Sequence, residues 1–314
     1  MNKKGLEFSF AWLFAILAGA VIIFLAIYIS MRFIKTGEYE VNTLTAKQLS
    51  IIFEPMETGA ASGKSSLVSL NDETRIFNDC YDYGNFGRNQ ISLSVKQGFK
   101  KEWAEPGGRI DVTNKYIFSE DVEQGREIYF FSKPFNMPFK ISEIIFLTSK
   151  KYCFVNAPGN IKDEVSGLNL KNIMLENCSA NHNRVCFGAS NCEISVIGMC
   201  SGYECENEFD YGEIIKGKES VTYAGSLLYA GIFSDKEIYE CNVKRLMKKL
   251  SILALLYKDE ADYISDKCGS SYTNLVLLAN SAKSLKDSKD LLFLIDTAEK
   301  LEQENNAGEC KIWA

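Results

Sequence analysis

A stretch without a single charged side chain runs from Phe8 to Met31, with the sequence FSFAWLFAILAGAVIIFLAIYISM. As a helix rising about 1.5 Å per residue it covers roughly 36 Å, more than the ~30 Å hydrocarbon core of a bilayer. A secretory signal has a shorter apolar region followed by a cleavage site between small residues, and a core helix rarely carries so long an apolar run. The sequence therefore predicts a retained membrane helix, with the lipid bilayer as its partner.

Positive charges flank this helix on both sides, at Lys3 and Lys4 before it and at Arg32 and Lys35 after it. With the terminal amine included, the excess lies on the N-terminal side, which favours a cytoplasmic N-terminus. All 10 cysteines follow the helix, and an even number of cysteines is typical of disulfides formed in an oxidising compartment. We therefore expect a single-pass protein of the cell membrane whose C-terminal domains are extracytoplasmic.

The spacing of Cys178, His182, Cys186 and Cys192 also allows a metal cluster. Structural zinc sites usually present closely spaced cysteine pairs of the C-x2-C type, and the sequence contains no such pair. Disulfides are therefore the favoured interpretation, and we assign no metal ligands.

Composition agrees with a folded ectodomain: 46% of the residues are hydrophobic, 24% are charged, and the net charge is −6. The acidic balance argues against nucleic acid or anionic lipid as the main partner. Hydrophobic patterning predicts an α+β fold in three parts. These are a membrane helix with an extracytoplasmic extension (1–57), a cysteine-stapled antiparallel β domain (58–233) and an α-helical bundle (234–314).

The membrane helix is expected to continue to Phe53 and to pack its second half on the ectodomain. No proline occurs there before Pro55, and apolar residues recur close to helical spacing, at Val41, Leu44, Leu49, Ile52 and Phe53. From about Ser66 to Phe233, apolar residues instead alternate with polar ones between Gly, Pro, Asn and Asp turns. Ile91, Leu93 and Val95 are one example, and Ile194, Val196 and Gly198 are another.

Three amphipathic helices with short links are expected after Ser234, which forms a capping box with Glu237. Such helices make an up-down-up bundle, in which the first and third helices end at the same pole. Because Cys268 follows the first helix and Cys310 follows the third, we predict a Cys268–Cys310 disulfide. Cys241 lies at the opposite pole and is left to pair with the β domain.

Several polar motifs have a structural explanation that we prefer to a chemical one. The segment from Gly59 to Ser65 has one residue too few between its glycines for a P-loop. His182 is the only histidine, so any catalytic triad would depend on it, and it lies in a polar segment typical of a surface loop. We therefore expect no enzyme activity and assign no catalytic residue and no cofactor.

Three further groups of polar residues are expected at the surface. Glu204, Glu206, Glu208 and Asp210 alternate and would share one face of a strand, where they could bind calcium or be solvated. Asn177 begins an N-x-S sequon and could carry a glycan unless a bridged Cys178 is partly buried. The first of the expected helices has an apolar leucine seam on one face, at Tyr239, Val243, Leu246, Leu250, Leu253 and Tyr257. The basic residues Lys244, Arg245, Lys248 and Lys249 lie opposite this seam, which predicts a solvated face.

The membrane segment carries small residues at every fourth position, at Ala11, Ala15 and Gly19. A stripe of small residues lets two helix backbones approach closely, which predicts a face for self-association.

The N-terminus also resembles that of a type IV pilin, in the style of archaeal pilin precursors. A short basic leader ends at Gly5, and Leu6-Glu7-Phe8 opens the apolar segment, although Glu7 lies closer to the glycine than in the pilin pattern. The resemblance implies cleavage after Gly5 and a role for Glu7 in neutralising a neighbour's terminal amine in a filament. The remainder resembles uncharacterised single-span surface proteins of archaea.

Two functions are therefore expected from different classes. The first is a membrane-anchored, pilin-like surface protein with a structural, assembly or adhesion role, whose partner is itself. The second is a single-span binding module that presents its ectodomain to a ligand or an envelope partner.

Overall fold

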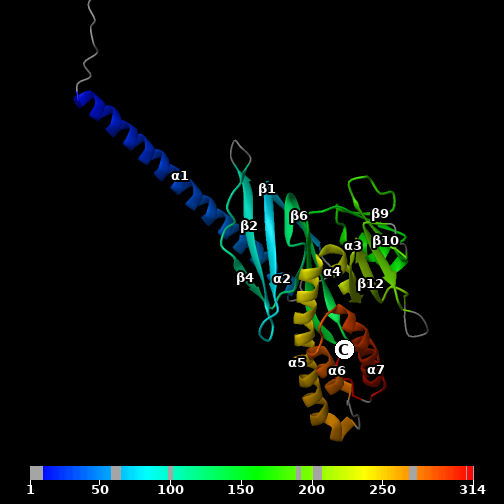
Figure 1. Ribbon diagram of the computed structural model, residues 1–314. Helices are drawn as coiled ribbons and strands as arrows, with labels where there is room; N and C mark the ends of the chain where they lie inside the picture. Colours follow the sequence, from blue (N-terminus) through cyan, green and yellow to red (C-terminus); the bar gives the residue numbers. More distant parts are fainter. Residues whose placement is uncertain are drawn as a thin grey trace, which may run out of the picture.

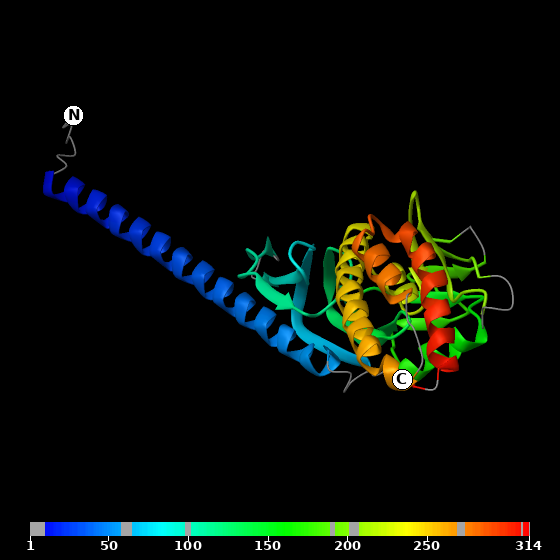
Figure 2. The ribbon, with the colours of Figure 1, turned by 90° about the horizontal axis from the view of Figure 1, so that it is seen from below.

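The computed structural model describes residues 10–57, 65–97, 102–188, 192–200, 207–268, 274–308 and 310–313. One long helix, α1 (Phe10–Ile52), extends as a rod from a head made of two β-sheets and a group of helices (Figures 1 and 2). The short helix α2 (Glu54–Glu57) follows it. The α+β class and the continuation of the apolar N-terminal helix toward Phe53 are thereby confirmed.

The first sheet contains seven strands in the order β3-β2-β1-β6-β7-β5, with β4 also paired to β2. Neighbouring strands in this sheet are antiparallel, except that β5 and β7 are parallel to each other. The strands are β1 (Ser65–Tyr81), β2 (Arg88–Gln97), β3 (Glu102–Trp103), β4 (Ile110–Thr113), β5 (Ile117–Phe118), β6 (Val122–Asn136) and β7 (Lys140–Thr148).

The second sheet contains six strands in the order β13-β12-β11-β10-β8-β9. Each neighbouring pair among β9, β8, β10 and β11 is parallel, whereas the β11–β12 and β12–β13 pairs are antiparallel. The predicted antiparallel domain is therefore wrong, and both sheets are mixed. Helix α3 (Gly159–Leu168) carries the chain from β8 to β9, and a crossover of this kind is what parallel neighbours require. The strands are β8 (Tyr152–Val155), β9 (Ile173–Leu175), β10 (Asn183–Phe187), β11 (Ile194–Gly198), β12 (Tyr211–Lys216) and β13 (Glu219–Ala224).

The first sheet is covered on both faces. One face packs against the end of α1, where Leu49 and Phe53 meet Ile91 and Leu93 in one hydrophobic core. The other face contributes to a second, larger core that also includes the second sheet and the C-terminal helices. Strand β7 is accordingly buried at every position after Lys140, with no alternation between faces.

The C-terminal helices are α5 (Lys236–Cys268), α6 (Asn274–Lys283) and α7 (Leu291–Ala307), with a 3-10 turn at Ser288–Asp290 before α7. The predicted leucine seam is confirmed, because Val243, Leu246 and Leu250 are fully buried in the second core. The predicted capping box is wrong. Ser234 is the C-cap of the preceding helix α4 (Leu227–Phe233), and its hydroxyl donates to the Ala230 carbonyl there.

Three disulfides join described cysteines. Cys80 on β1 is bonded to Cys241 on α5, which confirms that Cys241 pairs with the β region. The other two are Cys153–Cys178 and Cys186–Cys192, so the sulfurs of the alternative metal cluster are consumed in disulfides. Cys310 is also disulfide-bonded, but the Cys268 side chain lies outside the described residues, so the Cys268–Cys310 bond stays a prediction.

Candidate membrane anchor and ligand pocket

The first half of α1 is apolar and uncovered. Its large side chains are exposed throughout, from Phe10 (84% exposed) to Phe33 (75% exposed), and none of the most apolar window is buried by the head. The helix is long and apolar enough to cross a membrane, a property of membrane anchors and of signal sequences. Disulfides in the head suggest that it lies outside the cytoplasm.

The second half of α1 is docked on the first sheet. Its buried residues, Asn42, Ala46 and Leu49, follow spacings of four and three, and the buried Phe53 continues the pattern just after the helix ends. Of the five apolar residues that the sequence predicted to form this face, Leu49 and Phe53 are buried, whereas Val41, Leu44 and Ile52 are exposed.

Backbone proximity explains why a polar and a small residue lie where larger apolar ones were expected. A Cβ on Gly107 would lie 2.8 Å from the Asn42 backbone carbon, so the sheet and the helix nearly touch there. The Asn42 amide donates to the Glu105 carbonyl (3.2 Å), and the Gly108 N–H donates to the Thr43 hydroxyl (2.7 Å). These contacts fix α1 on the head by polar side chains as well as by its apolar ones.

A buried arginine connects α5 to the first sheet. Arg245 is 0% exposed, and its guanidinium donates to the carbonyls of Phe86 (2.9 Å) and Lys115 (3.0 Å). It also donates to the side-chain oxygens of Asn89 and Asn242 and lies 4.7 Å from the Tyr116 ring centre. Burial lowers the pKa of Arg245 to about 10, so the side chain stays charged at neutral pH.

The predicted solvated basic face is therefore wrong at Arg245. Lys248 and Lys249 are half-buried, and they donate to the Asp82 carbonyl and to the Ser142 hydroxyl. These acceptors are distant in the sequence, so no local pattern could have identified them.

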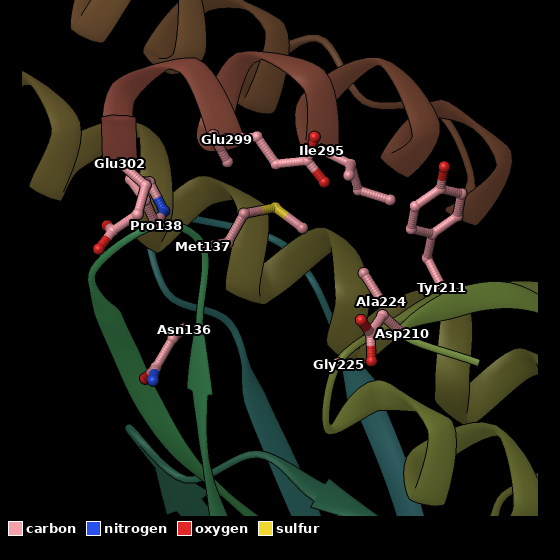
Figure 3. Close-up of a pocket in the computed structure, with 11 residues that line it drawn as sticks. Asn136, Met137, Pro138, Asp210, Tyr211, Ala224, Gly225, Ile295, Glu299 and Glu302 are labelled. Atoms are coloured by element: carbon pink, nitrogen blue, oxygen red, sulfur yellow. The ribbon is translucent and has the colours of Figure 1, made fainter. Parts of the chain in front are cut away.

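A pocket of about 290 Å³ lies between α7, the β6–β7 turn and the start of β12. Figure 3 shows Ile295, Glu299 and Glu302 of α7 along one wall, with Met137 and Tyr211 reaching toward that helix from other elements. Asp210 and the β13 end (Ala224, Gly225) line the same pocket, together with Asn136, Pro138 and Ala298.

The pocket combines an apolar lining with three carboxylates, and its described lining residues include no Lys, Arg or His. Glu302 accepts hydrogen bonds from the Trp313 indole N–H (2.9 Å) and from Asn306 (3.2 Å), which hold its carboxylate in place. Asp210 accepts from the Asn207 N–H (2.9 Å). The carboxylates beside an apolar lining favour a cationic ligand with an apolar body.

Apart from Asp210, the residues that the sequence predicted as candidate sites do not line this pocket. Ala11 and Ala15 are exposed on α1, and Gly19 is half-exposed with nothing within 4 Å of an added Cβ. Gly5 and Glu7 lie outside the described residues.

Asn177 is exposed, and its neighbour Cys178 is half-buried and bridged. His182 is half-exposed beside Ser179 and Asn181, in keeping with the expected loop.

The acidic run is not the predicted strand where it is described. Asn207 to Asp210 form a turn closed by the Asp210 N–H on the Asn207 carbonyl (3.1 Å), so Glu208 and Asp210 do not share a strand face. Glu204 and Glu206 lie outside the described residues, as does most of the Gly59–Ser65 segment. Among the described side chains, no group of three or more His, Cys, Asp or Glu is placed to hold a metal ion.

No protein-family model matches the chain, and neither a curated protein nor a solved structure shows significant similarity to it.

Proposed function

We propose that this chain is a membrane-anchored, extracytoplasmic surface protein with a structural, assembly or adhesion role. One observation carries the proposal: a single unbroken helix has an uncovered apolar half and a half docked in the head. An exposed apolar rod is unfavourable in water and needs lipid or other copies of itself around it. The N-terminus is cytoplasmic and the head extracytoplasmic in this proposal.

The continuity of α1 favours an anchor over a removable signal. Residues 10–52 form one helix, in which Asn42 and Leu49 are buried against the head. No flexible linker separates the apolar half from the docked half, so movement of one is transmitted to the other. A stiff connection of this kind suits a protein that positions its head at a defined height and angle, as a pilin-like assembly would require.

Alkaline extraction of membranes tests the anchor. The wild-type protein is expected to stay in the membrane pellet after carbonate washing. The variant Ile22→Arg places a charge in the middle of the span, at a cost of about 3 kcal/mol or more, and is expected to weaken insertion. Leu44→Arg, on the exposed side of the docked half, is the matched control and should stay in the pellet. Release of the wild-type protein by carbonate would contradict the anchor.

The self-association of the span is tested at the small-residue stripe. Gly19→Ile adds a branched side chain where the stripe requires close backbone approach, so crosslinked oligomers should decrease. Ile16→Val, off the stripe, serves as the control. An unchanged oligomer ladder for Gly19→Ile would leave the stripe as ordinary lipid-facing sequence. A mature N-terminus at Leu6 would favour the pilin-like role, and an intact Met1 would favour the binding module.

The pocket favours a second candidate, a binding module for a small organic cation. Its volume is near the lower end of the range typical of ligand sites, and its carboxylates would pair with an ammonium group. Tyramine is compared with an analogue that has a carboxylic acid in place of the amine, each added to the full-length protein in detergent. The comparison shows whether binding depends on the charge of the ligand or only on its shape. Tyramine should raise the melting temperature, and Asp210→Asn should abolish the shift. Asp296→Asn, on the exposed side of α7, should leave the shift unchanged. Equal shifts with the acid would exclude this ligand class.

A further inference from the structure

The first charged residue after the membrane segment fixes the height of the head above the lipid. Arg32 ends the uncharged run, and Phe33 and Ile34 behind it are still 75% and 61% exposed. Lys35 and Glu38 therefore lie only ~4.5 Å and ~9 Å further along the helix axis than Arg32. The headgroup layer of one leaflet is about 5–8 Å thick. Lys35 and Glu38 thus fall within this layer or at its outer edge.

The head reaches down to the same level. A cavity of about 300 Å³ is lined by Lys35 and Glu38 of α1 together with Trp103 of β3 and Glu105 in the loop that follows it. The Lys35 ammonium lies 3.6 Å from the Glu105 carboxylate, and both side chains are mostly exposed, by 70% and 79%. Because these residues share one cavity, Trp103 lies at the height of the headgroups whenever α1 spans a bilayer.

We propose that the β3 edge of the first sheet rests on the membrane surface and that its cavity receives a phospholipid headgroup. The proposal rests on the membrane anchor proposed above and adds the surface that touches the lipid.

The chemistry of the edge fits a zwitterionic headgroup. Glu38, Glu102 and Glu105 line the cavity and can form ion pairs with a headgroup ammonium, while Lys35 can pair with the phosphate. The half-buried Trp103 is an amphipathic ring of the kind that concentrates at membrane interfaces. The Arg75 guanidinium lies 4.0 Å from its ring centre, and the Lys96 ammonium lies 5.3 Å away, so two further cations border the ring.

This contact would hold the head at a fixed orientation. Together with α1, a second attachment at β3 leaves the head no freedom to rotate about the helix axis. The same surface would remain in water if the apolar half of α1 were enclosed by other copies of the chain.

Tryptophan quenching in phosphatidylcholine vesicles tests the contact, because the chain contains 3 tryptophans at well-separated positions. Trp313 is 5% exposed and is retained in every variant as a constant background. The Trp12→Phe protein then reports Trp103, the Trp103→Phe protein reports Trp12, and the double variant reports the background alone. Vesicles carry either a nitroxide on the headgroup or bromine near the acyl-chain ends.

The Trp12→Phe protein is expected to be quenched by the headgroup nitroxide more than by the acyl-chain bromine, and this quenching should be lost in the double variant. Since Trp12→Phe retains the native β3 edge, the main measurement does not depend on how well a Trp103 variant folds. Trp12 should instead be quenched by the lipid-embedded labels. Quenching of Trp12 with none at Trp103 would overturn the contact and leave the anchor intact. Absence of quenching at both positions would overturn the anchor as well.

Discussion

Gly107, in the loop between β3 and β4, lies against the backbone of α1 at Asn42, so closely that a Cβ on Gly107 would be 2.6 Å from the neighbouring Thr43 nitrogen. The Gly107 N–H is bonded to the Leu93 carbonyl (2.9 Å), which holds this loop on strand β2. The close approach explains how one helix can have an uncovered apolar half and still form part of the head. Its docked half has no side chain between it and the sheet at this point.

Gly107→Ala is therefore expected to displace α1 from the sheet and to lower the free energy of unfolding by about 1–3 kcal/mol. Urea denaturation of the full-length protein in detergent measures the change. Gly167→Ala is the matched control, because nothing lies within 4 Å of its added Cβ in helix α3. The control should be neutral or stabilising by up to ~1 kcal/mol, since alanine favours a helix more than glycine does. Equal effects of the two substitutions would contradict a tight contact at Gly107.

Arg245→Met should destabilise the head by roughly 3 kcal/mol or more, because it leaves several buried acceptors without a donor. The carbonyls of Phe86 and Lys115 and the side-chain oxygens of Asn89 and Asn242 would lose their partner. Lys244→Met, at the half-exposed position before it, is expected to change stability by less than about 0.5 kcal/mol. Thermal denaturation compares the two. A change in stability for Arg245→Met as small as that for Lys244→Met would mean that the guanidinium is solvated.

Stability should depend on pH through Glu123, a carboxyl of β6 that is 1% exposed. Burial raises its pKa to about 7, against hydrogen bonds from the Ser149 N–H (2.7 Å) and hydroxyl (2.6 Å), which lower it. The folded state thus holds the proton up to about pH 7, whereas the unfolded chain releases it near pH 4.5. The stability that protonation provides is present at low pH and is lost as the pH rises from about 4.5 to about 7.

Glu123→Gln mimics the protonated form and should remove this dependence. Relative to the variant, the wild-type protein should lose up to about 3 kcal/mol between pH 4.5 and pH 7.5, since one pKa unit corresponds to ~1.4 kcal/mol. Glu219→Gln changes an exposed carboxyl and should leave the wild-type pH profile in place. Identical profiles for wild type and Glu123→Gln in urea titrations would show that Glu123 is not held neutral.

Peptide mapping without reductant should find a Cys268–Cys310 peptide. Cys310 is disulfide-bonded, and Cys241, the other cysteine on α5, is already bonded to Cys80. A bond that closes a loop of about 42 residues would stabilise the C-terminal helices by ~4 kcal/mol on the chain-entropy model. The Cys80–Cys241 peptide is the internal control. Cys310 joined to any cysteine other than Cys268 would contradict the predicted arrangement of the helix ends.

Most features that depend on neighbours in sequence were predicted, although the capping box at Ser234 was not, and of those that depend on distant neighbours only the pairing of Cys241 with the β region was. The apolar run predicted α1, and the leucine seam predicted the buried face of α5, because each is a periodic local signal. Parallel pairing in the second sheet could not be predicted, since it follows from crossovers such as that through α3. Arg245 lies among lysines in the sequence, a pattern that predicts a solvated helix face. Its hydrogen-bond acceptors belong to Phe86, Asn89 and Lys115, which are distant in the sequence, so its burial could not be predicted.

The candidate pocket was invisible to sequence analysis for a similar reason. Its lining comes from four separate parts of the chain, near Met137, Asp210, Ala224 and Glu299, and only Asp210 belongs to a motif that the sequence shows. The apolar half of α1, in contrast, was predicted, because a long uninterrupted run of apolar residues is a local signal.

Protease shaving of intact cells, with mass spectrometry of the released and retained peptides, tests the central claim most directly. The proposal predicts that peptides from the head, such as those around Arg88 and Lys218, are released from intact cells. It also predicts that the apolar segment before Arg32 remains in the membrane fraction. Head peptides that appear only after lysis would contradict the extracytoplasmic location. A mature N-terminus beyond Ile34 would show that the apolar half of α1 is a removed signal rather than an anchor.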